Sequence, residues 1–153
     1  MSTRRQRDTE AGITLLEILV VLTIIGLIST VVAINVLPAL QQGRAEKART
    51  DISQLTTSLE YYNSQIFSYP TEAQGLEALI EAPSDLDNPR RYPNGGFIQS
   101  LPDDPWGRPY QYIFPAERSR AAYDLFSFGA DGVEGGEGDN ADIGNWDEED
   151  EDF

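Results

Sequence analysis

The chain has 153 residues, which allows one domain of modest size and an appendage. Its 11 basic and 26 acidic residues give a formal net charge of −15, which disfavours binding to nucleic acid or anionic lipid head groups and favours cations. The chain contains neither Cys nor His, which excludes disulfides and disfavours a zinc site or a His-dependent triad. Any bound metal is therefore expected to be a hard cation held by oxygen.

The N-terminal region combines a polar, basic stretch with a long apolar run. Residues 1–12 read MSTRRQRDTEAG, and an apolar run of 21 residues extends from Ile13 to Ala33. As an α-helix this run would be about 31 Å long, enough to cross the hydrocarbon core of a bilayer. A secretory signal has a similar basic flank, but this run exceeds the usual apolar length and lacks a small-x-small cleavage site. The run is therefore predicted to be a transmembrane helix.

Glu17 is the one charged residue in the apolar run. A simple membrane anchor would let this carboxylate snorkel to the interface. A second interpretation requires cleavage of the chain after Gly12. The new α-amino group of Ile13 would then lie in the same apolar layer as Glu17, and the two opposite charges would attract strongly between neighbouring molecules. On that interpretation the anchor is also an assembly element.

The region after the apolar run is predicted to continue as an amphipathic helix to about Gln65. Its apolar side chains recur at spacings of 4, 3, 4, 3 and 4 residues, which is the period of one helix face. A small domain is expected to cover that face. Pro38 and Gly43 are expected to interrupt or bend the helix. The spaced residues are Ala48, Ile52, Leu55, Leu59, Tyr62 and Ile66.

The C-terminal region has the pattern of a small α+β domain. Thr71 and Gln74 form a capping-box pattern that predicts a short helix to Ile80. Residues 83–109 are predicted to be ordered loop with a short strand near 97–101, and residues 110–114 and 123–128 an antiparallel hairpin. Core and hairpin packing is expected of five tyrosines, Tyr61, Tyr62, Tyr69, Tyr110 and Tyr112, and packing against the hairpin of Trp106 and Trp146. Asp103-Asp104 is interpreted as structural rather than catalytic. The acidic run at 147–152 is predicted to be disordered.

Residues 131–142 hold five carboxylates among four glycines. Calcium accepts six to eight oxygens from carboxylates and carbonyls, so this composition suits it better than magnesium, which requires a stricter octahedron. The spacing is not that of an EF-hand. From the residues alone, both a calcium site and a solvated acidic loop remain open.

The leader and the start of the apolar run carry a family resemblance. A short basic segment ending in Gly12, followed by Ile13-Thr-Leu-Leu-Glu17, resembles the class III signal of type IV pilins and pseudopilins. The resemblance implies that a membrane peptidase cuts after Gly12 and methylates Ile13, and that Glu17 guides subunits into a helical filament. The family usually has Phe where this chain has Ile13, and its helix Pro commonly falls nearer position 34 than Pro38.

Three further motifs are similar to the major-pseudopilin family of type II secretion systems. They are YPTEAQGLEAL at 69–79, LPDDPWGRPY at 101–110, and FGADG at 128–132 continued by DIGNW at 142–146. The resemblance implies an α+β, type IV pilin-like fold in which a long N-terminal helix packs on a small domain with a hairpin and a calcium-binding loop. Its expected segments are a leader at 1–12, a transmembrane and assembly helix at 13–37, a periplasmic domain at 38–146 and an acidic tail at 147–153. The implied calcium ligands are the side chains of Asp131, Asp139 and Asp142 and the backbone carbonyls of Phe128 and Val133.

The function implied by the resemblance is structural and not enzymatic. The chain is expected to be a single-pass inner-membrane protein that polymerises with itself into a periplasmic filament. Three basic residues precede the apolar run and three follow it, so the positive-inside rule leaves the orientation to the resemblance. Expected partners are a prepilin peptidase, minor pseudopilins, inner-membrane assembly proteins and membrane lipid, but no nucleic acid. Alternatives are a type IV pilin or minor pseudopilin and, from another class, a membrane-anchored calcium-binding enzyme or binding module.

Overall fold

The computed structural model describes residues 14–146, apart from the side chains of residues 31 and 33–37. The predicted leader at 1–12, Ile13 and the acidic tail at 147–153 therefore lie outside the described residues. The chain divides into two compact units, residues Met1–Ala39 and Leu40–Phe153. The second unit contains the hydrophobic core and all of the described strands.

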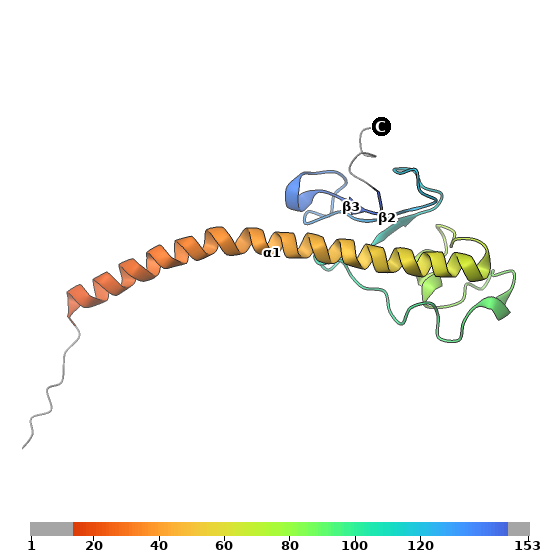
Figure 1. The fold of residues 1–153 in the computed structure, drawn as a ribbon, viewed down its shortest axis with the longest axis horizontal. Helices are drawn as coiled ribbons and strands as arrows, with labels where there is room; N and C mark the ends of the chain where they lie inside the picture. The colour runs from red at the N-terminus through yellow and green to blue at the C-terminus, as the bar shows by residue number, and fades with distance from the viewer. Residues whose placement is uncertain (1–13, 147–153) are drawn as a thin grey trace, which may run out of the picture. The chain divides into compact units, whose positions relative to one another are not determined.

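One helix, α1, runs from Leu15 to Ile66 and contains Pro38 (Figure 1). Its end agrees with the predicted end near Gln65. The helix continues through both Pro38 and Gly43, so it is not interrupted there, and the alternative of a bend at these residues stays a prediction. Pro38 removes one backbone donor, and the helix assignment holds on either side of it. Within the described part of the chain, no helix combines the length and hydropathy that crossing a membrane requires.

The second half of α1 supplies the central face of the core. The predicted stripe is confirmed, since Ala48, Leu59 and Tyr62 are at most 1% exposed and the residues between them at that spacing are also buried. This stripe packs with the hairpin and with the segment after α1, and each fully buried Leu side chain contributes about 1.5–3 kcal/mol through removal from water. The other buried apolar residues of this cluster are Leu76, Ala78, Leu79, Tyr110, Tyr123 and Leu125.

The predicted helix over 71–80 forms only in part. The capping box is present, because the Thr71 backbone N–H donates to Gln74 Oε1 at 2.9 Å and the Gln74 N–H donates to Thr71 Oγ1 at 3.3 Å. Regular structure is limited to a 3₁₀ turn, η1, from Leu76 to Leu79. Gly75 lies between the box and this turn with φ of 61°, a left-handed conformation that stops an α-helix from continuing out of the cap.

The sheet has three short antiparallel strands in the order β1-β2-β3. The predicted hairpin is confirmed by the pairing of Tyr112 in β1 with Leu125 in β2. The third strand was not predicted, and it pairs with the other edge of β2 through Ser127 and Ile143. The bounds are Gln111–Ile113 for β1, Asp124–Ser127 for β2 and Ile143–Gly144 for β3.

The region predicted as a strand near 97–101 is irregular instead. The Phe97 and Ile98 backbone N–H groups both donate to the carbonyl of Leu79, at 2.7 and 3.2 Å, so this segment bonds to η1 and not to a strand. Two further 3₁₀ turns complete the described elements, η2 at Pro89–Arg91 and η3 at Gly138–Asn140.

Candidate functional site

Glu17 lies in the first turn of α1, where a carboxylate is favoured by the helix dipole. Its backbone N–H donates to Thr14 Oγ1 at 3.2 Å, which makes Thr14 the N-cap of the helix. This cap was not predicted, although the spacing Thr-x-x-Glu is a known signal for it. Glu17 is exposed, and its predicted partners in processing and assembly, Gly12 and Ile13, lie outside the described residues.

The described residues of α1 that follow Glu17 present an apolar surface with no cover. Leu15 is 87% exposed, Leu22 63% and Leu27 66%, and every described residue from 14 to 39 is exposed. The hydroxyl groups of two polar residues have hydrogen-bond partners within the helix. Thr23 Oγ1 donates to the Leu19 carbonyl, and Thr30 Oγ1 donates to the Gly26 carbonyl. A continuous apolar surface of this kind is typical of a site for lipid or for other protein chains.

The five predicted calcium ligands lie in or beside one loop that follows β2. Asp131 Oδ1 accepts from the Val133 backbone N–H at 3.1 Å in a local turn, and the Asp139 carbonyl accepts from Ala130 at 2.9 Å. The Asp142 side chain is 3% exposed, and its Oδ2 accepts from Gly135 at 3.1 Å. Phe128 lies at the start of the loop, directly after β2.

Two arginines that the sequence analysis did not single out hold this loop in place. Arg118 Nη2 lies 2.7 Å from Asp142 Oδ2 and 3.1 Å from Glu134 Oε1. The Arg118 guanidinium also lies over the rings of Phe126 and Trp146, at 4.6 and 5.1 Å from their centroids. Nothing in the local sequence signals these contacts, because Asp142 is 24 residues from Arg118 along the chain.

Arg108 binds the backbone at the start of the loop. Its Nη2 donates to the carbonyl of Gly129, and its Nη1 donates to the carbonyl of Ala130 at 3.4 Å. Gly132 has a φ of 73°, which favours glycine there, and a Cβ at this position would oblige the Arg108 guanidinium to shift. The loop is thus anchored to the strand region by two cationic side chains.

The donor set gives a mixed fit to a cation. Asp139 Oδ1 and Asp142 Oδ1 are buried and have no hydrogen-bond partner, which is the state of a carboxylate oxygen that lacks its ligand. Among the described residues, however, no group of three or more acidic side chains is positioned to hold a metal. A calcium ion here would take two buried carboxylates and complete its oxygen shell from backbone carbonyls or water.

Of the Asp103-Asp104 pair, Asp104 has the predicted structural role. Asp104 is 4% exposed, and its Oδ1 accepts from the Trp106 and Arg108 backbone N–H groups at 3.0 and 2.8 Å. Its Oδ2 accepts from Ser127 Oγ at 2.6 Å, which joins this turn to β2. These three donors use the Asp104 carboxylate to hold the local backbone in place.

The predicted core role holds for four of the five tyrosines singled out, since Tyr62 and Tyr110 are buried and Tyr69 and Tyr112 pack against the core cluster. Tyr61 is a correction, because it is 51% exposed and contacts the Phe97 ring only edge-on. Its position one residue before Tyr62 turns it away from the buried stripe of α1. Trp146 packs near the hairpin as expected, 5.4 Å from the Phe126 ring.

Comparison with protein families finds two matches that together cover most of the chain. Residues 35–146 match the family described as "Type II secretion system (T2SS), protein G", and residues 7–33 match the prokaryotic N-terminal methylation motif. The second match includes Gly12, Ile13 and Glu17, which carry the predicted processing and assembly roles.

Several curated proteins are similar over nearly their whole length. Proteins named "Type II secretion system core protein G" match from Pseudomonas aeruginosa, at 42% identity over 93% of this chain and 99% of the relative, and from Vibrio cholerae, at 46% over 90% and 92%. Among solved structures, the major pseudopilin from the type 2 secretion system of enterohaemorrhagic Escherichia coli is similar, with a TM-score of 0.62 and 38% identity. That match covers 73% of this chain and 94% of the crystallised one.

Proposed function

The chain belongs to the type II secretion system protein G family, and on that premise we propose that it is the major structural subunit of a type II secretion pseudopilus. The observation that carries the proposal is the family match over residues 35–146, together with a methylation motif that precedes an exposed apolar helix. A structural subunit needs surfaces for its neighbours and no reacting groups, so its role is non-enzymatic. Growth of the filament would help to move folded proteins across the outer membrane.

Assembly is proposed to depend on Glu17 and Ile13. Hydrolysis of the Gly12–Ile13 peptide bond by a prepilin peptidase would leave Ile13 with a free amino group, which is then methylated. In the apolar interior of a filament the Glu17 carboxylate of one subunit would pair with this amine on a neighbour. The N-cap by Thr14 supports this role, since it fixes the first turn of α1 and so limits the positions open to Glu17.

Before assembly the subunit is proposed to be held in the inner membrane by residues 13–37, with the domain in the periplasm. The exposed apolar side chains of α1 support this location, because lipid would cover them until other subunits replace it. The filament would then meet minor pseudopilins and inner-membrane assembly proteins of the same secretion system.

The test of the processing step is the intact mass of the full chain expressed with a prepilin peptidase. The expected product has lost residues 1–12 and gained one methyl group. The Gly12→Ala variant should remain uncut, because the family motif places the scissile bond after this glycine. Normal processing of Gly12→Ala would contradict the assignment.

The test of assembly is the yield of filaments sheared from cells that carry the secretion machinery. The Glu17→Ala variant should be processed and membrane-bound yet yield no filaments, since its neighbour's amine would be left unpaired in an apolar layer. The matched control is Glu46→Ala, which removes an exposed carboxylate from the same helix. Wild-type yield from Glu17→Ala would reject the charge pairing, whereas secretion without any filament would reject the pseudopilus.

Calcium is proposed to stabilise the loop at 128–142. Asp139 and Asp142 would supply their unpartnered buried oxygens, and Asp131 with the carbonyls of Phe128 and Val133 would supply others. The bound ion would neutralise carboxylates that otherwise repel one another in a loop that Arg118 neutralises only in part.

Calcium at 100 times its dissociation constant should raise the free energy of unfolding by about 2.7 kcal/mol, a shift of several degrees in Tm. Chelator should reverse the shift. Asp139→Asn should abolish the response, and the matched control Glu137→Gln, an exposed acid of the same loop, should retain it. An equal response from both variants would reject the site.

A further inference from the structure

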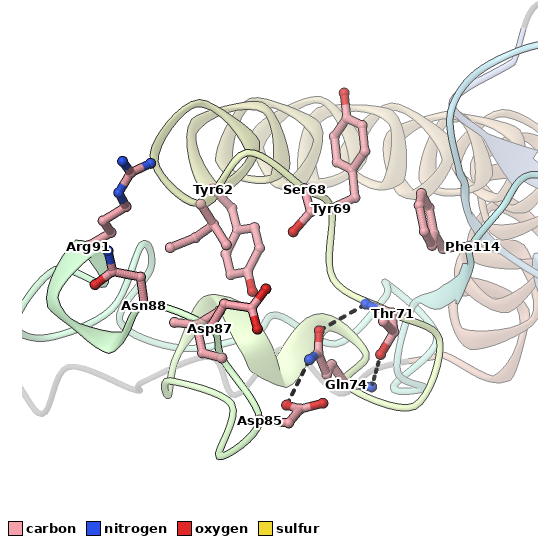
Figure 2. Close-up of a pocket in the computed structure, with 12 residues that line it drawn as sticks. Tyr62, Ser68, Tyr69, Thr71, Gln74, Asp85, Asp87, Asn88, Arg91 and Phe114 are labelled. Atoms are coloured by element: carbon pink, nitrogen blue, oxygen red, sulfur yellow. Dashed lines mark hydrogen bonds between the residues drawn. The ribbon is translucent and has the colours of Figure 1, made fainter.

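A cavity of about 490 Å³ lies beside the C-terminal end of α1. Figure 2 shows aromatic rings and carboxylates meeting around it: Tyr62 forms its wall, Phe114 lies across from it, and the side chain of Asp87 points toward the space between them. Asp85 lies at the lower edge, where one oxygen accepts from Gln74 Nε2 at 2.8 Å. The cavity thus combines apolar walls with acidic side chains at its edge.

The electrostatic environment of this cavity is negative. Burial raises the pKa of Tyr62 above its ordinary value, and the charge of Asp85 raises it further. Of the described residues that line the cavity, Arg91 is the one cation, and its guanidinium lies over the Phe67 ring, 4.4 Å from the centroid. Among the described residues, no Lys or Arg forms an ion pair with Asp85 or Asp87. Aromatic walls with carboxylates at the edge suit a cationic side chain that has an apolar stem.

Arg44 carries a positive charge, opposite to that of the cavity, and lies on α1, whose C-terminal end borders the cavity. It falls one turn before Ala48 on the face of α1 that its own domain buries further along, yet Arg44 is exposed. Within the described chain no ion pair or hydrogen bond of the Arg44 side chain is found, whereas nearby Lys47 is paired with Asp51. Leu40, one turn earlier, is 56% exposed. The inward face of α1 therefore continues past the edge of the domain without cover.

Arg44 cannot reach the cavity of its own chain. Eighteen residues of continuous helix separate it from Tyr62, about 27 Å at 1.5 Å per residue, which is several times the reach of an arginine side chain. An acidic cavity and a complementary unpaired cation at two separate points of one chain are the two halves of a head-to-tail contact. A head-to-tail contact between identical subunits generates a helical filament when the rotation between neighbours does not close into a ring.

We propose that the cavity lined by Tyr62, Phe114 and Asp87 receives the Arg44 side chain of a second copy of this chain. The proposal rests on the proposed filament and names a contact between the domains of its subunits, separate from the Glu17 pairing. A second copy is favoured over another partner by charge. Chains with a net charge of −15 repel one another at most approaches, so one matched cation and acidic cavity would select the register in which they associate.

The first test is a charge exchange in the full chain, measured as the yield of sheared filaments. Arg44→Glu and Asp87→Arg should each lower the yield about tenfold or more, because each places like charges in contact. The double variant should recover most of the yield. Arg49→Glu is the matched control on the same helix and Glu72→Arg on the domain, since both residues are exposed and neither lines the cavity.

The second test uses the absence of native Cys. A chain carrying Arg44→Cys and Asp87→Cys, treated with a short bis-maleimide, should form covalent dimers and longer ladders from filaments. Each single variant should form no ladder, and Arg49→Cys with Asp87→Cys should form far fewer dimers. These exposed sites leave the core unchanged, and an unchanged Tm of each variant confirms that its fold is intact.

The outcomes separate this contact from the filament itself. Absence of filaments from the wild-type chain would reject the proposed function. Wild-type filaments without the cross-link would overturn the contact, and so would normal assembly of Arg44→Glu. Loss of assembly in Arg44→Glu that Asp87→Arg fails to restore would place Arg44 against a different surface and would overturn it as well.

Discussion

The two halves of α1 contain similar apolar residues in opposite environments. Leu16 is 71% exposed, whereas Leu59 on the same helix is fully buried. In the first half apolar residues occupy every side of the helix, and no single small domain could cover them all. In the second half they recur on one face, and the chain's own hairpin covers that face. The domain thus covers the apolar face of α1 with its own residues, whereas the described residues of the N-terminal half have no such cover from this chain.

The largest expected effect tests this contrast directly with one substitution at two positions. Leu59→Ala should lower the free energy of unfolding by about 2–5 kcal/mol, because it leaves a cavity in the core. Leu16→Ala should leave the Tm of the domain unchanged and act only on membrane retention or assembly. The measurement is thermal unfolding of the full chain in detergent. A comparable loss of Tm from Leu16→Ala would contradict the division between the two halves.

A smaller effect is expected where the domain closes its own sheet. The Asn145 side chain accepts from the Leu125 N–H at 2.9 Å and donates to the Tyr123 carbonyl at 3.0 Å, which extends the pairing along β2. Asn145→Ala should cost about 1–3 kcal/mol, since it leaves buried backbone groups of β2 unpaired. Asn140→Ala, at an exposed position nearby, is the matched control. Equal urea midpoints for the two variants would show that the side chain is dispensable.

A graded effect is expected in alkali, and it concerns the domain that covers its own core. Burial raises the pKa of Tyr123 from its ordinary value of 10.0 to about 12 and also raises the pKa values of Tyr110 and Tyr112. The folded chain therefore holds these protons more tightly than the unfolded chain. Stability should be complete below pH 10 and should fall above it, by roughly 1.4 kcal/mol per pH unit for each such tyrosine.

Urea unfolding between pH 9 and pH 12 measures this loss of stability. The absorbance of tyrosinate follows the ionisation of the tyrosines over the same interval. The Tyr123→Phe variant should lose less stability across the same interval, because one of the shifted groups is gone. Identical slopes for the variant and the wild-type chain would contradict the assignment to Tyr123.

Local patterns in the sequence predicted what depends on neighbours along the chain. The 4-and-3 spacing that includes Leu55 and Leu59 predicted the buried face of α1 because helix period is a local property. The hairpin followed from two aromatic segments separated by a short polar one. The helix predicted after Thr71 did not extend because Gly75 takes a left-handed conformation, which a capping pattern alone does not reveal.

Contacts between distant residues could not be predicted in the same way. Strand β3 has two residues and exists only because β2 offers a free edge, so its own sequence carries little strand signal. The position of Arg118 against Asp142 depends on how two loops meet after folding. In the candidate sites, the family resemblance supplied the roles of Gly12, Ile13 and Glu17, whereas the Thr14 cap was readable from sequence and was missed.

Because residues near the end of the described chain pair with β2, the sheet is completed late in synthesis. Residues 143–145 pair with the free edge of β2, and a Cβ at Gly144 would overlap the Trp146 ring that packs there. The sheet cannot be complete until residue 145 has emerged, whereas the apolar half of α1 emerges well before it. The domain would therefore complete its sheet only after all of α1 has been synthesised. Slow synthesis of residues 143–145 would prolong exposure of the unfinished core to proteolysis.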